Sequence, residues 1–108
     1  MTMSPEVMVP TTPTLAVVLA RLRDLQLDPR RRYPIKEMGV FGSYARDEQT
    51  ADSDLGVLVD FDAPIGLFDF VGLRQELADH LGLSINLVMK DAPTARVRAR
   101  ILAEVVML

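Results

Sequence analysis

The strongest constraint on the fold is the run Leu55-Gly-Val-Leu-Val-Asp-Phe61, which is rich in branched apolar residues and bounded by polar turns. Such a run is typical of a β-strand buried in a sheet. Ile35–Phe41 and Ile85–Met89 predict two further strands. The apolar residues between these runs follow helical spacing, so strands and helices alternate. This pattern predicts an α/β (α+β) fold, in which a small mixed three-stranded sheet is flanked by helices.

The helix boundaries are predicted from capping residues and prolines. The first helix should begin near Thr14, with Thr12 as cap and Pro13 in its first turn, and should end before Asp28-Pro29, because a residue that precedes proline avoids helical dihedrals. A short helix can open over Ser43–Arg46. A long helix is predicted to end at Gly82, and a last helix to run from Asp91–Thr94 to about Val106. The long helix carries an apolar stripe of Leu67, Phe70, Leu73, Leu77 and Leu81.

Length and composition indicate one domain. The chain has 108 residues, of which 49% are hydrophobic. Residues 1–13 are predicted to be an extended lead-in and residues 14–108 a single domain. The absence of cysteine excludes a disulfide framework, a thiolate zinc site and a thiol nucleophile. No apolar run approaches the roughly 18 residues of a membrane span, and no basic residue precedes Arg21, so a cytoplasmic protein without a membrane partner is expected.

Charge is segregated along the chain. Residues 47–79 hold nine carboxylates against Arg74 alone, and the flanking segments are basic. An acidic centre suits a metal site or a basic partner, although a solvated face explains it equally well. The basic triplet Arg30–Arg32 is interpreted as a solvated turn, so nucleic acid is not expected as a direct ligand.

One segment carries a pattern with chemical meaning. Gly42-Ser43 ends a predicted strand and opens a helix, where backbone N–H groups, a hydroxyl and the helix dipole favour a phosphate. Asp54 follows at the head of the next strand, where it could hold a metal ion that bridges to those phosphates.

This segment resembles the minimal nucleotidyltransferases of the DNA polymerase beta-like superfamily. Their signature reads Gly-Ser-x-Ala-Arg-Gly-Glu, a short turn and then Ser-Asp-x-Asp before an apolar strand. The resemblance covers roughly residues 35–104 and includes the ending Arg100–Glu104. The residues that match the signature are Gly42, Ser43, Ala45, Arg46, Glu48, Ser53 and Asp54.

The resemblance implies a site for ATP and Mg²⁺. In the family, an Asp-x-Asp pair and a third carboxylate on the next strand bind two Mg²⁺ ions. Asp54 matches the first aspartate and is the candidate catalytic and metal-binding residue, whereas Gly56 and Asn86 stand where the other two carboxylates belong. Gly42, Ser43 and Arg46 are the candidate nucleotide-binding residues. An alternative is that Asp52 and Asp54 form a shifted pair, which requires the strand to begin early.

Other conspicuous residues have simpler interpretations. Tyr44 is expected to be half-exposed on a helix, and His80 to be solvated near a helix end. Arg46 could form an ion pair with Glu48 or Asp47 instead of binding a phosphate. Phe68 and Phe70 are expected to be core or interface side chains.

Two functions follow from the resemblance. Minimal nucleotidyltransferases are commonly antitoxins that silence a small helical HEPN-domain toxin by transferring AMP from ATP to a tyrosine. The chain is therefore predicted to be such an antitoxin, in an oligomer or hetero-oligomer with its partner. The alternative is a catalytically degenerate homologue that inhibits its partner by contact alone, because two carboxylates are missing.

Overall fold

The computed structural model describes residues 12–27, 33–91 and 94–108. The helices are α1 (Leu15–Leu27), α2 (Leu67–Leu81) and α3 (Ala95–Glu104), and a 3₁₀ helix over Gly42–Tyr44 follows the first strand. The strands are β1 (Ile35–Phe41), β2 (Leu55–Phe61), β3 (Ile85–Met89) and β4 (Val106–Met107). Most of the predicted lead-in and the triplet Arg30–Arg32 lie outside the described residues.

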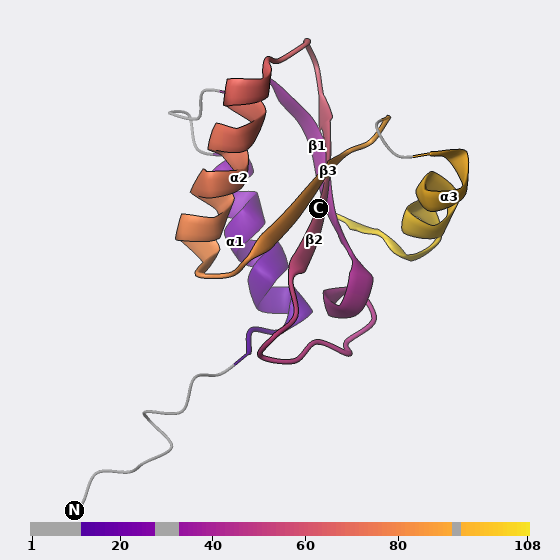
Figure 1. The fold of residues 1–108 in the computed structure, drawn as a ribbon. Coiled ribbons are helices and arrows are strands. Elements are labelled where there is room, and N and C mark those ends of the chain that lie inside the picture. The colour runs from indigo at the N-terminus through magenta and orange to yellow at the C-terminus, as the bar shows by residue number, and fades with distance from the viewer. Residues whose placement is uncertain (1–11, 28–32, 92–93) are drawn as a thin grey trace, which may run out of the picture.

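The four strands form one mixed sheet in the order β3-β2-β1-β4. β1 pairs antiparallel with β2 and β4, and β2 pairs in parallel with β3. Helices α1 and α2 cover one face of the sheet and α3 lies on the other (Figure 1). The predicted mixed α/β architecture is therefore confirmed.

Alternate residues of β2 pack on opposite faces of the sheet, as strand geometry requires. Leu55, Val57 and Val59 belong to the main core beneath α1 and α2. Leu58 belongs to a smaller cluster with Phe41 and Ile101, beneath α3. The core is therefore thick on one face of the sheet and thin on the other.

The sheet has one strand more than the sequence predicts. The last helix ends at Glu104, and the residues that follow form β4, in which Val106 pairs with Val40 and Met107 with Gly39. A Cβ at Gly39 would lie 2.6 Å from the Met107 sulfur, so glycine at this position allows the edge strand to approach closely.

The predicted cap of the first helix is wrong. Helix α1 begins at Leu15, and the hydroxyl of Thr14 accepts a hydrogen bond from the Val17 N–H at 3.3 Å. Pro13 therefore precedes the cap instead of lying in the first turn. The predicted C-terminal cap of the long helix is confirmed, because Gly82 adopts a left-handed φ of 67° after α2. Thr94, the last residue of the predicted start of the final helix, caps α3.

Tyr44 is buried, whereas the sequence predicts a half-exposed side chain. Only 1% of the residue is exposed, and it belongs to the main core. The 3₁₀ helix turns its ring inward, where burial raises the pKa of the phenol above its usual value of 10.0.

The raised pKa of Tyr44 predicts a loss of stability at alkaline pH. Above pH 10 the unfolded chain releases the phenol proton while the folded chain retains it, so the free energy of unfolding falls as pH rises through this range. Urea unfolding of the wild type and of Tyr44→Phe between pH 9 and 11 should show a shallower decline in the variant. Equal declines in the two proteins would contradict this assignment.

Candidate nucleotide-binding site

The 3₁₀ helix Gly42–Tyr44, here called the Gly-Ser turn, ends β1 with an abrupt change of direction. Gly42 has a φ of +83°, which residues with a Cβ rarely adopt. Its carbonyl oxygen accepts hydrogen bonds from the N–H groups of Ala45 and Arg46 at 3.0 and 3.2 Å. The half-buried Ser43 hydroxyl has no hydrogen-bond partner within the described part of the chain. The turn therefore carries the Ser43 hydroxyl at the position where the sequence predicts a phosphate-binding group.

The carboxylate of Glu104 contacts the Gly-Ser turn from the end of α3. Its Oε1 accepts the Gly42 backbone N–H at 3.0 Å, and its Oε2 accepts Nη1 of Arg46 at 2.7 Å. Arg46 also donates from Nε to Glu48 at 3.0 Å. The sequence left an ion pair of Arg46 with Glu48 or Asp47 open as an alternative to a phosphate contact, and it did not indicate the contact with Glu104. The available signal was a carboxylate three residues after Ile101, on the side of α3 that packs on the sheet.

These contacts shift the pKa values of both Glu104 and Arg46. Hydrogen bonding to Arg46, and then to the Gly42 N–H, lowers the pKa of Glu104 below its usual 4.5. Hydrogen bonds to Glu48 and Glu104 raise the pKa of Arg46. The folded chain therefore keeps Glu104 ionised, and the stability that this contact contributes is lost only as pH falls through the lowered pKa.

Gly56 and Asn86, which stand at the missing carboxylate positions, lie side by side. Gly56 of β2 pairs with Phe41 on β1 and with Asn86 on β3. A Cβ built at Gly56 would lie 2.8 Å from both the Phe41 carbonyl oxygen and Cε2 of its ring. Phe41 therefore fills the space in which a second aspartate side chain would begin.

Asp54 lies directly before β2 and is exposed. Strand β2 begins at Leu55, whose N–H donates to the Ser84 carbonyl oxygen at 2.8 Å. Asp52 lies in a turn, in which its N–H donates to the Thr50 hydroxyl at 3.3 Å. Because the strand does not extend back to Asp52, the alternative of a shifted Asp52–Asp54 pair is wrong.

The residues at this site do not fit a pair of Mg²⁺ ions. Mg²⁺ requires anionic oxygens in nearly octahedral geometry. Asp54 supplies one carboxylate, Asn86 is neutral, and Gly56 has no side chain and is covered by Phe41. Among the residues that the structure describes, no group of three His, Cys, Asp or Glu side chains could hold a metal ion.

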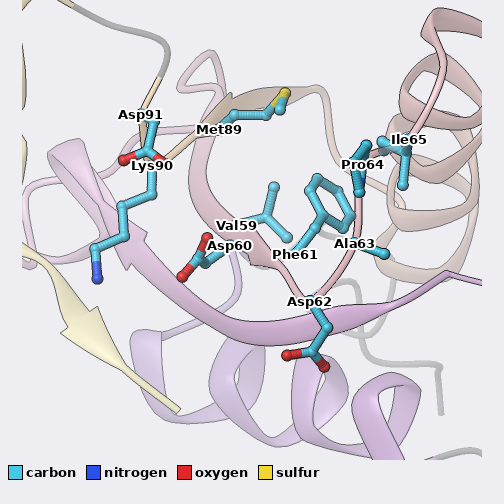
Figure 2. A pocket seen from close by; sticks show the side chains of 10 residues that line it. All are labelled: Val59, Asp60, Phe61, Asp62, Ala63, Pro64, Ile65, Met89, Lys90 and Asp91. Carbon is cyan, nitrogen blue, oxygen red and sulfur yellow. The ribbon is translucent and has the colours of Figure 1, made fainter.

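A separate pocket lies at the opposite end of β2 and β3. Its volume is about 240 Å³. In Figure 2 the side chains of Phe61, Pro64 and Ile65 gather on one side of it, and Asp62 points away from them. Lys90, which also lines it, donates to Glu37 at 3.3 Å. No predicted site residue lines this pocket.

The remaining predicted side chains have structural positions. His80 is exposed near the end of α2, as expected. Phe70 packs against the main core, but Phe68 is 92% exposed and Leu67 is 75% exposed, so neither belongs to the core. None of the helices that the structure describes is both long and apolar enough to cross a membrane.

The chain is similar in sequence to known proteins. The model of the nucleotidyltransferase domain family matches residues 22–106. The chain belongs to the nucleotidyltransferase domain family. It is 43% identical over 77 residues to the protein adenylyltransferase MntA of Thermococcus cleftensis, an alignment that covers 71% of this chain and 78% of that relative.

Solved structures show the same fold. A minimal nucleotidyltransferase of known structure superposes with a TM-score of 0.74 and 32% identity, over 92% of this chain and all of that one. The complex of tri-AMPylated Shewanella oneidensis HEPN toxin with its MNT antitoxin contains a chain that matches with a TM-score of 0.57 and 18% identity. This match covers 86% of the present chain and 66% of the other.

The family signature also bears on the backbone conformation of Asp47. The signature has glycine at this position, and Asp47 has a φ of 59°, in the left-handed region. Aspartate adopts this conformation more readily than most residues with a Cβ, so the turn keeps its shape without glycine.

The tight packing at Gly56 makes a testable prediction. Gly56→Ala should lower the free energy of unfolding by about 1–3 kcal/mol, because β1 or the Phe41 ring must move to admit the methyl group. Gly66→Ala is the control: nothing lies within 4 Å of its Cβ, so the cost should stay below about 1 kcal/mol. Urea denaturation measures both, and equal costs would show that Gly56 is not tightly packed.

Proposed function

We propose that this protein is an antitoxin of the minimal nucleotidyltransferase type that neutralises a HEPN-type toxin by binding it, without transferring a nucleotide. The observation that carries this proposal is the contact between Phe41 and Gly56, which leaves no space for a second carboxylate beside Asp54. The likeness to an MNT antitoxin chain supports the choice of partner.

An apolar surface with an acidic border supports a contact function. Leu67 and Phe68 project into solvent at the start of α2. Beside them is a groove of about 490 Å³, whose lining includes Ile65, Phe70 and Leu87. Exposed apolar surface of this kind marks protein–protein contacts. The exposed carboxylates of Asp62 and Asp69 lie close by in the sequence and suit a basic partner such as an RNA-cleaving toxin.

The proposal predicts a complex that needs neither ATP nor Mg²⁺. Isothermal titration of the protein with its HEPN-type partner should give the same affinity with and without MgATP, and Asp54→Ala should leave that affinity unchanged. A complex that forms only with MgATP would overturn the proposal.

The apolar surface gives this test a matched pair of variants. Leu67 and Leu27 are both 75% exposed, on different helices. Leu67→Asp should weaken the complex at least about tenfold, because it places a charge in the contact, and Leu27→Asp should change it little. If both variants bind like the wild type, this surface is not the interface.

Adenylyl transfer is the second candidate. It is favoured by the 43% identity to a protein adenylyltransferase and by the presence of Ser43 and Asp54 in the signature positions. Incubation of the complex with MgATP and mass analysis of the partner distinguishes the two functions. No added AMP is expected, and a mass increase of one or more AMP groups would establish transfer.

A further inference from the structure

Strand β3 forms one open edge of the sheet. Among the described strands it pairs with β2 alone. The Leu55 N–H donates to the Ser84 carbonyl oxygen at 2.8 Å, and the Lys90 N–H donates to the Val59 carbonyl oxygen at 2.9 Å. Because successive residues of a strand direct their backbone groups to alternate sides, every second residue of β3 directs its N–H and C=O away from β2. These residues are Ile85, Leu87 and Met89.

β3 lacks the features by which proteins protect a strand edge. Protected edges are very short, or they carry a charge, a proline or a bulge. β4, at the other edge, has two residues, whereas β3 has five, with neither a charge nor a proline. The pairing of β3 with β2 runs without a shift in register. Lys90 directly follows β3, but its Nζ donates to Glu37 on β1 at 3.3 Å, so the charge lies on the far side of β2 and away from the edge.

The open backbone groups of β3 are arranged symmetrically about Leu87. A second β3 strand that runs antiparallel, with a two-fold axis at Leu87, places Ile85 of one copy opposite Met89 of the other. Each outward N–H then faces a carbonyl oxygen of the other copy. A contact of this kind uses the same surface on both copies and closes on itself as a dimer. No charged residue of the strand meets its own copy across the axis.

The groove beside β3 supplies the apolar area that such a contact needs. A stable interface buries about 800 Å² on each partner, which is more than a strand of five residues offers by itself. The groove of about 490 Å³ is lined by β3 and by the start of α2. The residues of β3 that line it are Leu87, Val88 and Met89. Met89 is 36% exposed, so pairing at this edge removes apolar surface from water.

We infer that β3 is the interface of a homodimer, in which the β3 strands of two copies pair antiparallel about Leu87 and join the two sheets into one. The axis is perpendicular to the sheet, so the α2 helices of both copies lie on the same face and the two grooves meet beside Leu87. A helical partner then contacts a surface that both copies form. This inference goes beyond the proposed function, because the dimer forms without a toxin.

A charge at the edge of β3 tests the inference. In sedimentation equilibrium of the full chain alone, the wild type should reach twice the mass of one chain. Met89→Asp places a carboxylate opposite Ile85 of the other copy, and it should weaken the dimer at least about tenfold. A wild type that stays monomeric up to millimolar concentration would overturn the inference.

Met107→Asp is the matched control. Met107 is 39% exposed on β4, the opposite edge of the sheet, and therefore resembles Met89 in residue type, exposure and position in an edge strand. Its dimer should stay within about threefold of the wild type in dissociation constant. Equal weakening by the two substitutions, or none by either, would show that β3 is not the interface.

Cysteine cross-linking tests the register and does not depend on the aspartate variants. The chain has no cysteine of its own, so an introduced thiol reacts alone. In the inferred pairing Asn86 lies directly opposite Val88 of the other copy, whereas each residue lies diagonal to its own counterpart. Under mild oxidation a mixture of Asn86→Cys and Val88→Cys should form a covalent dimer several times faster than either variant alone. A mixture that is no faster than the single variants would overturn the inferred pairing.

Discussion

Burial of β2 on both faces is the constraint on which the rest of the structure depends. Leu55, Val57 and Val59 must face α1 and α2, so Gly56 and Leu58 must face α3. A shift of one residue in the register would move this apolar set from the thick core beneath α1 and α2 to the thin cluster beneath α3, so the register is strongly fixed. The same register places Gly56 between Phe41 and Asn86 and thereby determines what the candidate site contains.

The two faces of the sheet are held by different interactions. Two helices and most of the buried side chains stabilise one face. On the other face Ile101 is the buried side chain of α3, and the hydrogen bonds of Glu104 to the Gly-Ser turn supplement it. A surface ion pair alone contributes little to stability. The bond to the Gly42 N–H adds a fixed geometry, because it joins two elements that are 62 residues apart in sequence.

The sequence predicted the strands correctly because each of the three runs is apolar, branched and bounded by turn residues. β4 was missed because a strand of two residues has no periodicity, and its pairing depends on the missing side chain of Gly39. Tyr44 was predicted to be half-exposed because it fills a variable position in the signature, but a 3₁₀ helix directs its side chain differently from an α-helix. The three carboxylate positions came from the resemblance to the family signature, in which Asp54 matches the first aspartate and Gly56 and Asn86 stand where the other two carboxylates belong. The Phe41 ring over Gly56 and the contact of Glu104 were not predictable, because both depend on how distant segments pack.

The loss of two carboxylates changes the electrostatics of the fold as well as its chemistry. Neighbouring strands lie about 4.8 Å apart, so carboxylates at positions 56 and 86 would face each other beside Asp54. Like charges in such a row destabilise a sheet unless a cation balances them. With glycine and asparagine at these positions, Asp54 is the one carboxylate of the row and is exposed to water. The sheet therefore needs no bound cation to offset repulsion in this row.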